Sequence, residues 1–296
     1  MNAQPQANSK AQMKTFFHKE TFSLTHIISD GPGTDAVIID SVLDFDPVTG
    51  GITTTAADEV LGYVKEKDLK VTHVLDTHVH ADHLTAAKYL KSNLGVPYGL
   101  GVHLPDVQKE WAARYNISFD EVVRAADVDL LLADGDTIDL NGRPIGVLET
   151  PGHTPACITY TYDDMAFVGD TFFMPDYGTA RCDFPDGDAA QLFGSLEKIV
   201  ALGDATRLFM CHDYMPGGRE LRWEVTVAEQ KATNIHFSKS PDAQAFKAFR
   251  EDRDKDLDAP RLLLPSLQVN ICGGALPTPE DNGMRYIKIP LTGGWD

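Results

Sequence analysis

The chain has 296 residues, 43% hydrophobic and 24% charged, which is the composition of a globular protein with a full hydrophobic core. Acidic residues outnumber basic ones by 44 to 26, and the resulting formal charge of −18 repels nucleic-acid phosphates. No apolar run approaches the roughly 20 residues of a membrane span, and residues 1–17 lack the apolar core of a secretory signal. We therefore expect a cytoplasmic protein that binds neither nucleic acid nor a membrane. Its four cysteines have no C-x-x-C spacing and are expected to be reduced thiols.

The first half of the chain alternates apolar runs with amphipathic segments. After a flexible N-terminus at residues 1–15, the pattern predicts strands at 16–29, 35–40, 71–75 and 96–102 and helices at 55–67 and 84–94. Residues 40–51 read as a loop, and so do residues 103–116, apart from a helical turn. Ser118 and Glu121 have the spacing of a capping box, which predicts a short helix through residue 126.

The second half begins with closely spaced strands and becomes more helical. Strands are predicted at 130–132, 137–140, 145–149, 157–162, 165–168 and 207–210, and a helix at 189–201. Thr226 and Glu229 cap a further helix that runs towards residue 236, and Pro241 suits the first position of another. The tail from residue 260 is loop-rich, with possible strands at 266–271 and 284–289. Strand clusters flanked by helices predict two sheets covered by helices on the outside.

The strand at 71–75 leads directly into four side chains that can bind a metal, His78, His80, Asp82 and His83. Side chains two residues apart in an extended chain lie on the same side of the backbone and can converge. Burying so many polar groups without a cation would cost several kcal/mol per unpaired charge. The alternative is a solvated polar loop, which the preceding apolar strand argues against.

Three later positions repeat this pattern of a strand followed by a ligand side chain. They are His153 in Pro-Gly-His-Thr, Asp170 in Val-Gly-Asp-Thr and His212 in Cys-His-Asp. Each of them alone is more simply interpreted as an ordinary structural residue. Together with the first cluster, however, they provide imidazole and carboxylate groups without a thiolate, which predicts a zinc, iron or manganese site.

These motifs, in this order, resemble those of the metallo-β-lactamase superfamily. The resemblance implies an α/β fold, a four-layer αββα sandwich with the metal site at one edge of its two sheets, and a single catalytic domain over residues 16–296 with a C-terminal extension. Residues 77–86, 150–155 and 177–184 resemble more specifically the persulfide dioxygenases, iron proteins related to glyoxalase II. The bacterial branch that includes β-lactamase hydrolase-like proteins is the most similar.

Membership of that family implies that His78, His153 and Asp170 hold one Fe(II) per chain and that glutathione persulfide and O₂ react there to give sulfite and glutathione. Four groups, His80, Asp82, His83 and His212, would then surround the iron or mark a vacant second metal site. Because the residues of a dinuclear site are all present, a dizinc thioester hydrolase of the glyoxalase II kind remains the alternative, with zinc as the alternative metal.

Four residues are candidates for binding the glutathione part of the substrate. Arg181 matches the arginine of the family's Arg-x-Asp-Phe segment and is expected to bind a carboxylate, and Tyr214 matches a tyrosine near the thiol. Tyr177 and Arg222 are further candidates, although Arg222 also reads as a surface charge. Cys182 is either an ordinary buried cysteine or a reactive thiol. The resemblance also makes a homodimer possible. A metal-dependent nuclease and a non-catalytic sulfide sensor are less favoured functions.

Overall fold

The first large sheet joins an N-terminal hairpin to a series of parallel strands. The computed structural model describes residues 11–293. The strands of this sheet, in spatial order, are β1 (Gln12–His18), β2 (Ser23–Ser29), β3 (Asp35–Ile39), β6 (Lys70–Leu75), β8 (Tyr98–Gly101) and β9 (Leu130–Leu132). Because β3, β6, β8 and β9 are parallel, their carboxyl ends lie at the same edge of the sheet.

The second large sheet is mostly antiparallel. Its strands are β10 (Thr137–Leu140), β11 (Arg143–Glu149), β12 (Ile158–Tyr162), β13 (Met165–Phe167), β14 (Arg207–Phe209) and β15 (Glu224–Thr226), in that order. Strands β11, β13 and β14 run in the same direction, since β12 is antiparallel to both β11 and β13 while β13 and β14 are parallel. A small third sheet contains β5 (Gly51–Thr53), β4 (Val42–Asp46) and β7 (Leu84–Thr85).

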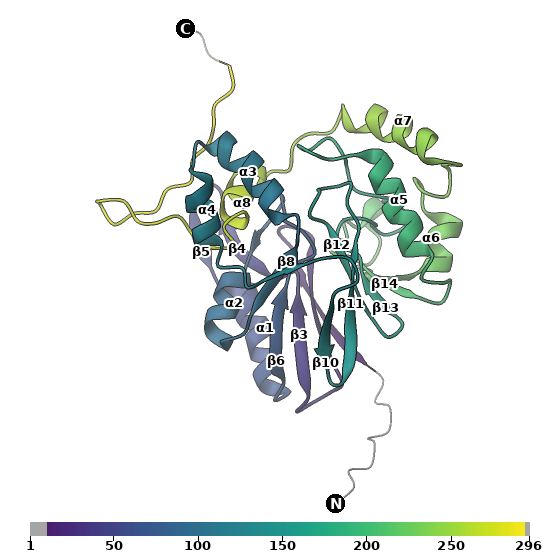
Figure 1. Cartoon of the computed structure of the whole chain (residues 1–296), viewed down its shortest axis with the longest axis horizontal. Helices are drawn as coiled ribbons and strands as arrows, with labels where there is room; N and C mark the ends of the chain where they lie inside the picture. The colour runs from purple at the N-terminus through teal and green to yellow at the C-terminus, as the bar shows by residue number, and fades with distance from the viewer. Residues whose placement is uncertain (1–10, 294–296) are drawn as a thin grey trace, which may run out of the picture.

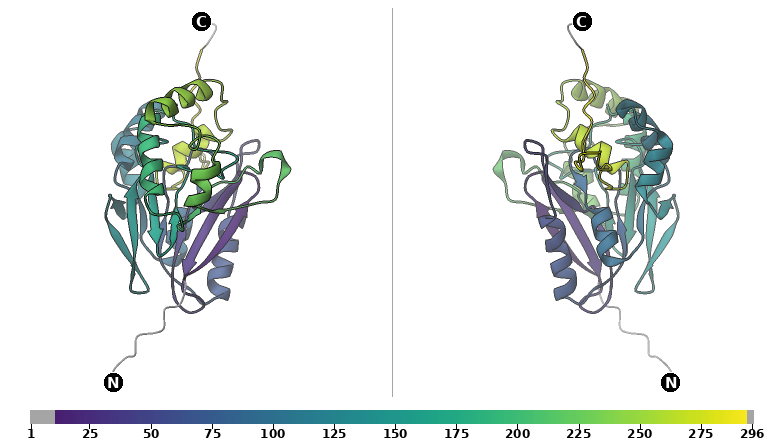
Figure 2. Two further views of the ribbon diagram at one scale, coloured as in Figure 1. Left: turned by 90° about the vertical axis from the view of Figure 1, so that its right-hand side faces the viewer. Right: turned by 90° about the vertical axis from the view of Figure 1, so that its left-hand side faces the viewer.

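Three apolar clusters hold the layers together. One lies between the two large sheets and includes Ile39 and Leu75 from the first and Tyr160 and Phe167 from the second. The outer face of the first sheet is covered by α1 (Thr55–Glu66), α2 (Ala87–Leu94), α3 (Leu104–Tyr115) and α4 (Phe119–Ala126). The outer face of the second is covered by α5 (Ala189–Val200), α6 (Val227–Thr233) and α7 (Ala243–Asp254). This arrangement confirms the αββα sandwich (Figures 1 and 2).

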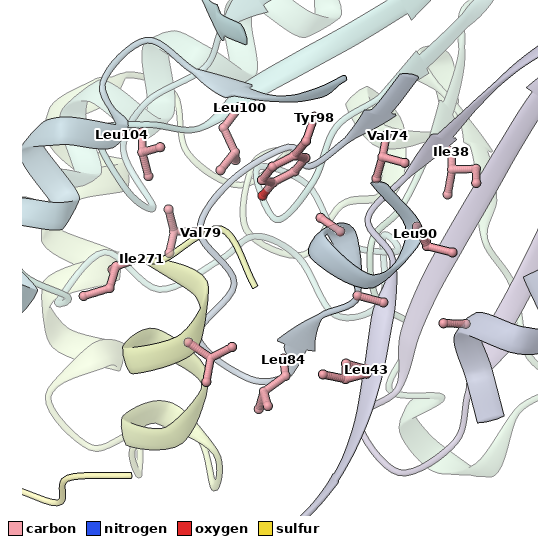
Figure 3. Packing of buried hydrophobic residues seen from close by; sticks show 14 of the residues in the cluster. Ile38, Leu43, Val74, Val79, Leu84, Leu90, Tyr98, Leu100, Leu104 and Ile271 are labelled. Carbon is pink, nitrogen blue, oxygen red and sulfur yellow. The ribbon is translucent and has the colours of Figure 1, made fainter. Parts of the chain in front are cut away.

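The last helix, α8 (Leu263–Asn270), returns to the first half of the molecule and packs against α3 and β7. Ile271, directly after it, belongs to the same apolar cluster as Val79, which lies in the loop after β6 (Figure 3). The C-terminal part of the chain therefore supports the loop that carries the first group of candidate ligands.

Local sequence signals located several boundaries correctly. Ser118 and Glu121 form the capping box of α4, and the Thr226 hydroxyl accepts a hydrogen bond from the Glu229 amide at the start of α6. Gly95 ends α2 in the left-handed conformation that favours glycine. Helix α7, by contrast, begins after Asp242, whose carboxylate accepts from the Ala245 amide, so the expected start at Pro241 was wrong.

Two helices were mistaken for other structure because each contains a proline. Residues 103–116, expected to be loop, form α3, in which Pro105 lies in the first turn, where its missing N–H costs no hydrogen bond. The strand expected at 266–271 is instead α8, whose first turn contains Pro265. Because α8 is buried along most of its length, its sequence shows no clear helical periodicity.

Several further boundaries also differ from the prediction. The expected strand at 16–29 is a hairpin of two strands, residues 84–85 are a strand ahead of α2, and the expected loop at 40–51 contains β4. The possible strand at 284–289 has no regular structure. Residues 1–10 of the expected flexible N-terminus lie outside the described residues, while residues 12–15 belong to β1. No helix in residues 11–293 has the length and apolar character to cross a membrane.

Candidate metal centre

The loop after β6 brings its ligand side chains together because it is fixed from both sides. His78, His80 and His83 are fully buried in it. Asn270 of α8 donates hydrogen bonds to the carbonyls of His80 and His83, at 2.8 and 2.7 Å, and accepts one from the Thr85 amide at 2.9 Å. One buried amide side chain thus fixes the backbone of the whole ligand loop.

The remaining candidate ligands come from the second sheet. His153 follows β11, Asp170 follows β13 and His212 follows β14, so all three lie beyond the carboxyl ends of strands that run in the same direction. Gly169 precedes Asp170 with a φ of +53°, and a Cβ atom there would lie 2.5 Å from the hydroxyl oxygen of Thr77. The close approach of the two sheets at this edge therefore requires a glycine.

His78, His153 and Asp170 form one buried group of ligand atoms. The Nε2 atoms of both histidines lie 3.7 Å from Oδ2 of Asp170. Nδ1 of His153 lies 2.9 Å from the carbonyl oxygen of Arg181, which can only accept a hydrogen bond. Nδ1 of His153 must therefore carry the proton, which leaves the Nε2 lone pair facing Asp170.

Asp40, directly after β3, fixes the other two imidazoles. It accepts hydrogen bonds from the amide and hydroxyl of Thr77, at 2.7 and 3.0 Å, and from Nε2 of His80 at 3.1 Å. Because the Thr77 hydroxyl donates to Asp40, it accepts from Nδ1 of His78, 3.0 Å away, and Nε2 of His78 keeps its lone pair. His80 in turn presents Nδ1, which has no hydrogen-bond partner.

His80, Asp82, His83 and His212 form a second group, adjacent to the first. Nε2 of His212 lies 3.2 Å from Oδ2 of Asp82 and 3.3 Å from Oδ1 of Asp170. The two oxygens of Asp170 therefore face different groups, Oδ2 the first and Oδ1 the second. The structure brings all the ligand candidates of the sequence analysis into one site and divides them into these two groups.

The protonation of these side chains suits a cation. Burial lowers the pKa of His78, His80 and His153, so all three are neutral and can coordinate a metal. Burial raises the pKa of Asp170 to about 7. Burial also acts against the charged form of Asp82, but the nearby imidazoles, His212 foremost, hold the pKa of Asp82 below its usual value.

Unpartnered atoms give an independent test of the fit to a metal. Within residues 11–293, most of the buried side-chain nitrogen and oxygen atoms without a hydrogen-bond partner belong to this site. They include Nε2 of His78, Nδ1 of His80, Nε2 of His83 and Oδ1 of Asp170. Leaving such groups unpaired costs about 1–3 kcal/mol each, whereas a bound cation would satisfy several at once. The residues present therefore fit a metal ion held by imidazole and carboxylate.

A cavity of about 450 Å³ opens onto the first group, with Asp82, His153 and Asp170 in its wall. Tyr177 and Tyr214 also line it and stack at 4.5 Å between ring centroids. The chain between α7 and α8 crosses from the helices of the second sheet towards α3 (Figure 1), and it contributes Leu257, Asp258, Pro260, Arg261 and Leu262 to the wall. The volume is within the range of small-molecule sites.

The substrate candidates have different surroundings. Tyr177, Tyr214 and Arg181 line the cavity, but Arg222 does not and instead pairs with Glu229 on the surface. The guanidinium of Arg181 is already bound: it donates to both carboxylate oxygens of Asp183, at 2.6 and 2.7 Å, and to the carbonyl of residue 258 at 2.6 Å. Its side chain therefore fixes the loop whose carbonyl orients His153.

All four cysteines are unpaired, as the sequence predicted. Cys211, directly before His212, also lies at the site: its Sγ groups with ligand atoms of Asp170 and His212, and burial raises the pKa of its thiol. Burial raises the pKa of the Cys182 thiol, which agrees with an ordinary buried cysteine rather than a reactive one. Its backbone amide donates to Asp254 of α7 at 2.8 Å.

Sequence reasoning missed Asp40 and Asn270 as residues of the site. Asp40 follows an apolar strand in the same way as Asp170, so the same signal could have identified it. Asn270 gives no such signal, because its role depends on a contact with a loop 185 or more positions away.

The class of protein follows from this fold and site. The sequence model of the metallo-β-lactamase superfamily matches residues 30–212, more than half of the chain, and the chain belongs to this superfamily. It is 46% identical to a β-lactamase hydrolase-like protein of Xylella fastidiosa, over 97% of this chain and 66% of that protein. The resemblance to that branch is thereby confirmed.

Two further relatives have names that differ in activity. Glyoxylase B2 of Dictyostelium discoideum is 42% identical and covers 96% of this chain and 98% of its own length. The human mitochondrial persulfide dioxygenase ETHE1 is 31% identical, with 68% of both chains covered. Among solved structures, ETHE1 from Myxococcus xanthus superposes with a TM-score of 0.71 at 29% identity, covering 89% of this chain and 99% of that one.

Proposed function

We propose that this protein is a non-haem iron(II) dioxygenase that oxidises glutathione persulfide with O₂ to sulfite and glutathione. The observation that carries the proposal is the separate grouping of His78, His153 and Asp170, without His80. Two histidines and one carboxylate on one face of a ferrous ion leave its other positions open, the arrangement of non-haem iron oxygenases. The similarity to the human persulfide dioxygenase supports the same assignment.

The reaction balances with water as the third reactant. The terminal sulfur of the persulfide loses four electrons, which O₂ accepts, and water supplies the third oxygen of sulfite. The sulfur–sulfur bond breaks, and the inner sulfur leaves as the thiol of glutathione. Two protons are released overall. Iron(II) held by the three ligands would supply the O₂ chemistry.

The chain's own residues hold the site in the form that this reaction needs. The backbone carbonyl of Arg181 fixes the tautomer of His153. Asp40 fixes the tautomer of His78 through the Thr77 hydroxyl. Tyr177 and Tyr214 form an aromatic wall beside the ligand group. His212 and Asp82, 3.2 Å apart, form a pair that can take up a proton released when the persulfide binds.

A dizinc thioester hydrolase is the second candidate, and one observation favours it. His80, Asp82, His83 and His212 form a complete second group of potential ligands next to Asp170, whose two oxygens face both groups. The similarity to glyoxylase B2 agrees with this activity. In that case two zinc ions would activate water rather than O₂.

Oxygen consumption separates the two candidates. Purified protein loaded with iron is mixed with glutathione persulfide in an oxygen electrode, and sulfite is measured in the same sample. The proposal predicts one sulfite formed per O₂ consumed, with loss of both in His78→Ala. If iron-loaded protein consumes no O₂, and zinc-loaded protein cleaves a glutathione thioester, the hydrolase is the correct function.

A further inference from the structure

The cavity beside the metal centre brings several arginines together, although the chain as a whole carries a formal charge of −18. Its wall contains the arginines Arg181, Arg250, Arg253 and Arg261. Two of these are neutralised within the protein. Arg181 pairs with Asp183, and the buried Arg250 pairs with Asp254 one turn further along α7. These two are part of the framework of the cavity rather than free to bind a ligand.

Arg253 and Arg261 differ from them. Neither has an ion-pair partner or a side-chain hydrogen bond within residues 11–293, and both are exposed to solvent. Arg253 follows Arg250 by three residues on α7, so the two arginines lie on the same face of the helix. Arg261 lies in the segment between α7 and α8. Two guanidinium groups are therefore available to an anionic ligand in this cavity.

The rest of the wall fits a particular ligand chemistry. Glu20 and Asp258 also line the cavity, and neither carboxylate has an ion-pair partner in the part of the chain that the structure describes. Tyr214 stacks on one side with Tyr177 and on the other with His212, a residue of the second ligand group. The cavity thus offers two cations, carboxylates for an ammonium group and an aromatic wall, which matches a small peptide thiol with two carboxylates and one amino group.

We propose that Arg253 and Arg261 bind the two carboxylates of the glutathione part of the substrate and determine the preference for glutathione persulfide over smaller persulfides. This assignment rests on the proposed function. It gives Arg181 the role of a framework residue and transfers carboxylate recognition to α7 and the segment that follows it. Arginine suits this role because its planar fork binds a carboxylate through two hydrogen bonds.

Kinetics with two substrates test the proposal. Iron-loaded Arg253→Gln, Arg261→Gln and the double variant are compared with wild type, with Arg124→Gln of α4 as a control for loss of a surface charge. We expect KM for glutathione persulfide to rise about tenfold for each change at nearly constant kcat, because each removes a charged hydrogen bond that forms equally in the ground and transition states. For the persulfide of 2-mercaptoethanol, which has no carboxylate, kcat/KM should not change.

The proposal is wrong if the double variant keeps the KM for glutathione persulfide within about twofold of wild type, or loses activity equally with both persulfides. Isothermal titration calorimetry measures the binding of reduced glutathione to wild type and to the double variant, and this measurement does not depend on the proposed dioxygenase activity. If wild-type protein consumes no O₂, binding of glutathione that weakens at least about tenfold in the double variant still supports the two arginines. Equal binding by wild type and double variant overturns their role.

Discussion

Asp40 should control metal binding although it is not itself among the three predicted iron ligands. In Asp40→Asn, one carboxylate oxygen that accepts a hydrogen bond becomes an NH₂ group that donates one. The Thr77 hydroxyl lies 3.0 Å from Oδ2 and 3.1 Å from Oδ1 of Asp40, and an NH₂ group at the nearer position would donate to it. The hydroxyl would then donate to Nδ1 of His78, and the proton of the imidazole would move to Nε2, the atom that faces Asp170.

The size of the effect follows from the hydrogen bonds that change. A hydrogen bond to a charged group contributes about 1.5–3 kcal/mol, and 1.4 kcal/mol corresponds to a factor of ten in an equilibrium constant. Loss of the correct tautomer of His78 should therefore weaken iron or zinc binding about 10–100-fold, the range found for residues that support metal ligands. Competition with a chromophoric chelator measures this affinity without any enzymatic assay.

Asp58→Asn is the matched control, because Asp58 also accepts two side-chain hydrogen bonds, from Thr54 and Tyr89, but on the surface. Thr77→Ser should keep metal binding near the wild-type value, whereas Thr77→Val should resemble Asp40→Asn. Wild-type metal affinity in both Asp40→Asn and Thr77→Val, with the protein folded by circular dichroism, would refute the tautomer argument.

Three further predictions concern the same edge of the sheets. Gly169→Ala should weaken metal binding by at least about tenfold, because the new Cβ would lie 2.5 Å from the Thr77 hydroxyl at a residue with positive φ. The control Gly194→Ala in α5, where a Cβ would meet nothing within 4 Å, should leave metal affinity unchanged. Equal metal affinities of the two variants would contradict this prediction. Burial raises the pKa of Asp170 to about 7, whereas it lowers the pKa of His78 and His153, the other two ligands of the first group. A proton on Asp170 therefore competes with the metal below pH 7, and chelator competition should show affinity falling about tenfold per pH unit from 7 to 5. A flat profile would show that Asp170 is ionised throughout. Asn270→Leu should destabilise the metal-free protein by at least about 3 kcal/mol in urea unfolding, because two carbonyls and one amide lose their partner, and a loss below about 1 kcal/mol would refute its role.

The candidate ligands could be identified from the sequence because each follows an apolar strand, and parallel strands bring their carboxyl ends to one edge. His153, Asp170 and His212 are far apart in the chain, yet this local rule identified all three. The grouping of His80 with His212 rather than with His78 was implied by the family resemblance and not by the spacing of the residues, since it depends on the side-chain orientation that Asp40 imposes.

Residues that act through contacts with distant parts of the sequence could not be identified from local sequence patterns. Arg181 has the residue type expected for binding a carboxylate, but its guanidinium is bound to Asp183 and to backbone carbonyls about 75 residues away. Arg253, in contrast, belongs to none of the motifs of the sequence analysis. Which arginine is free depends on packing of the segment after α7 against the loop at 177–184.

The central claim is that His78, His153 and Asp170 hold one iron while the second group of ligands holds none. Metal analysis of the protein purified from its native host by inductively coupled plasma mass spectrometry tests this most directly. The account predicts iron close to one per chain, lost in His153→Ala and retained in His83→Ala. Two zinc ions per chain, with both variants losing metal, would contradict it.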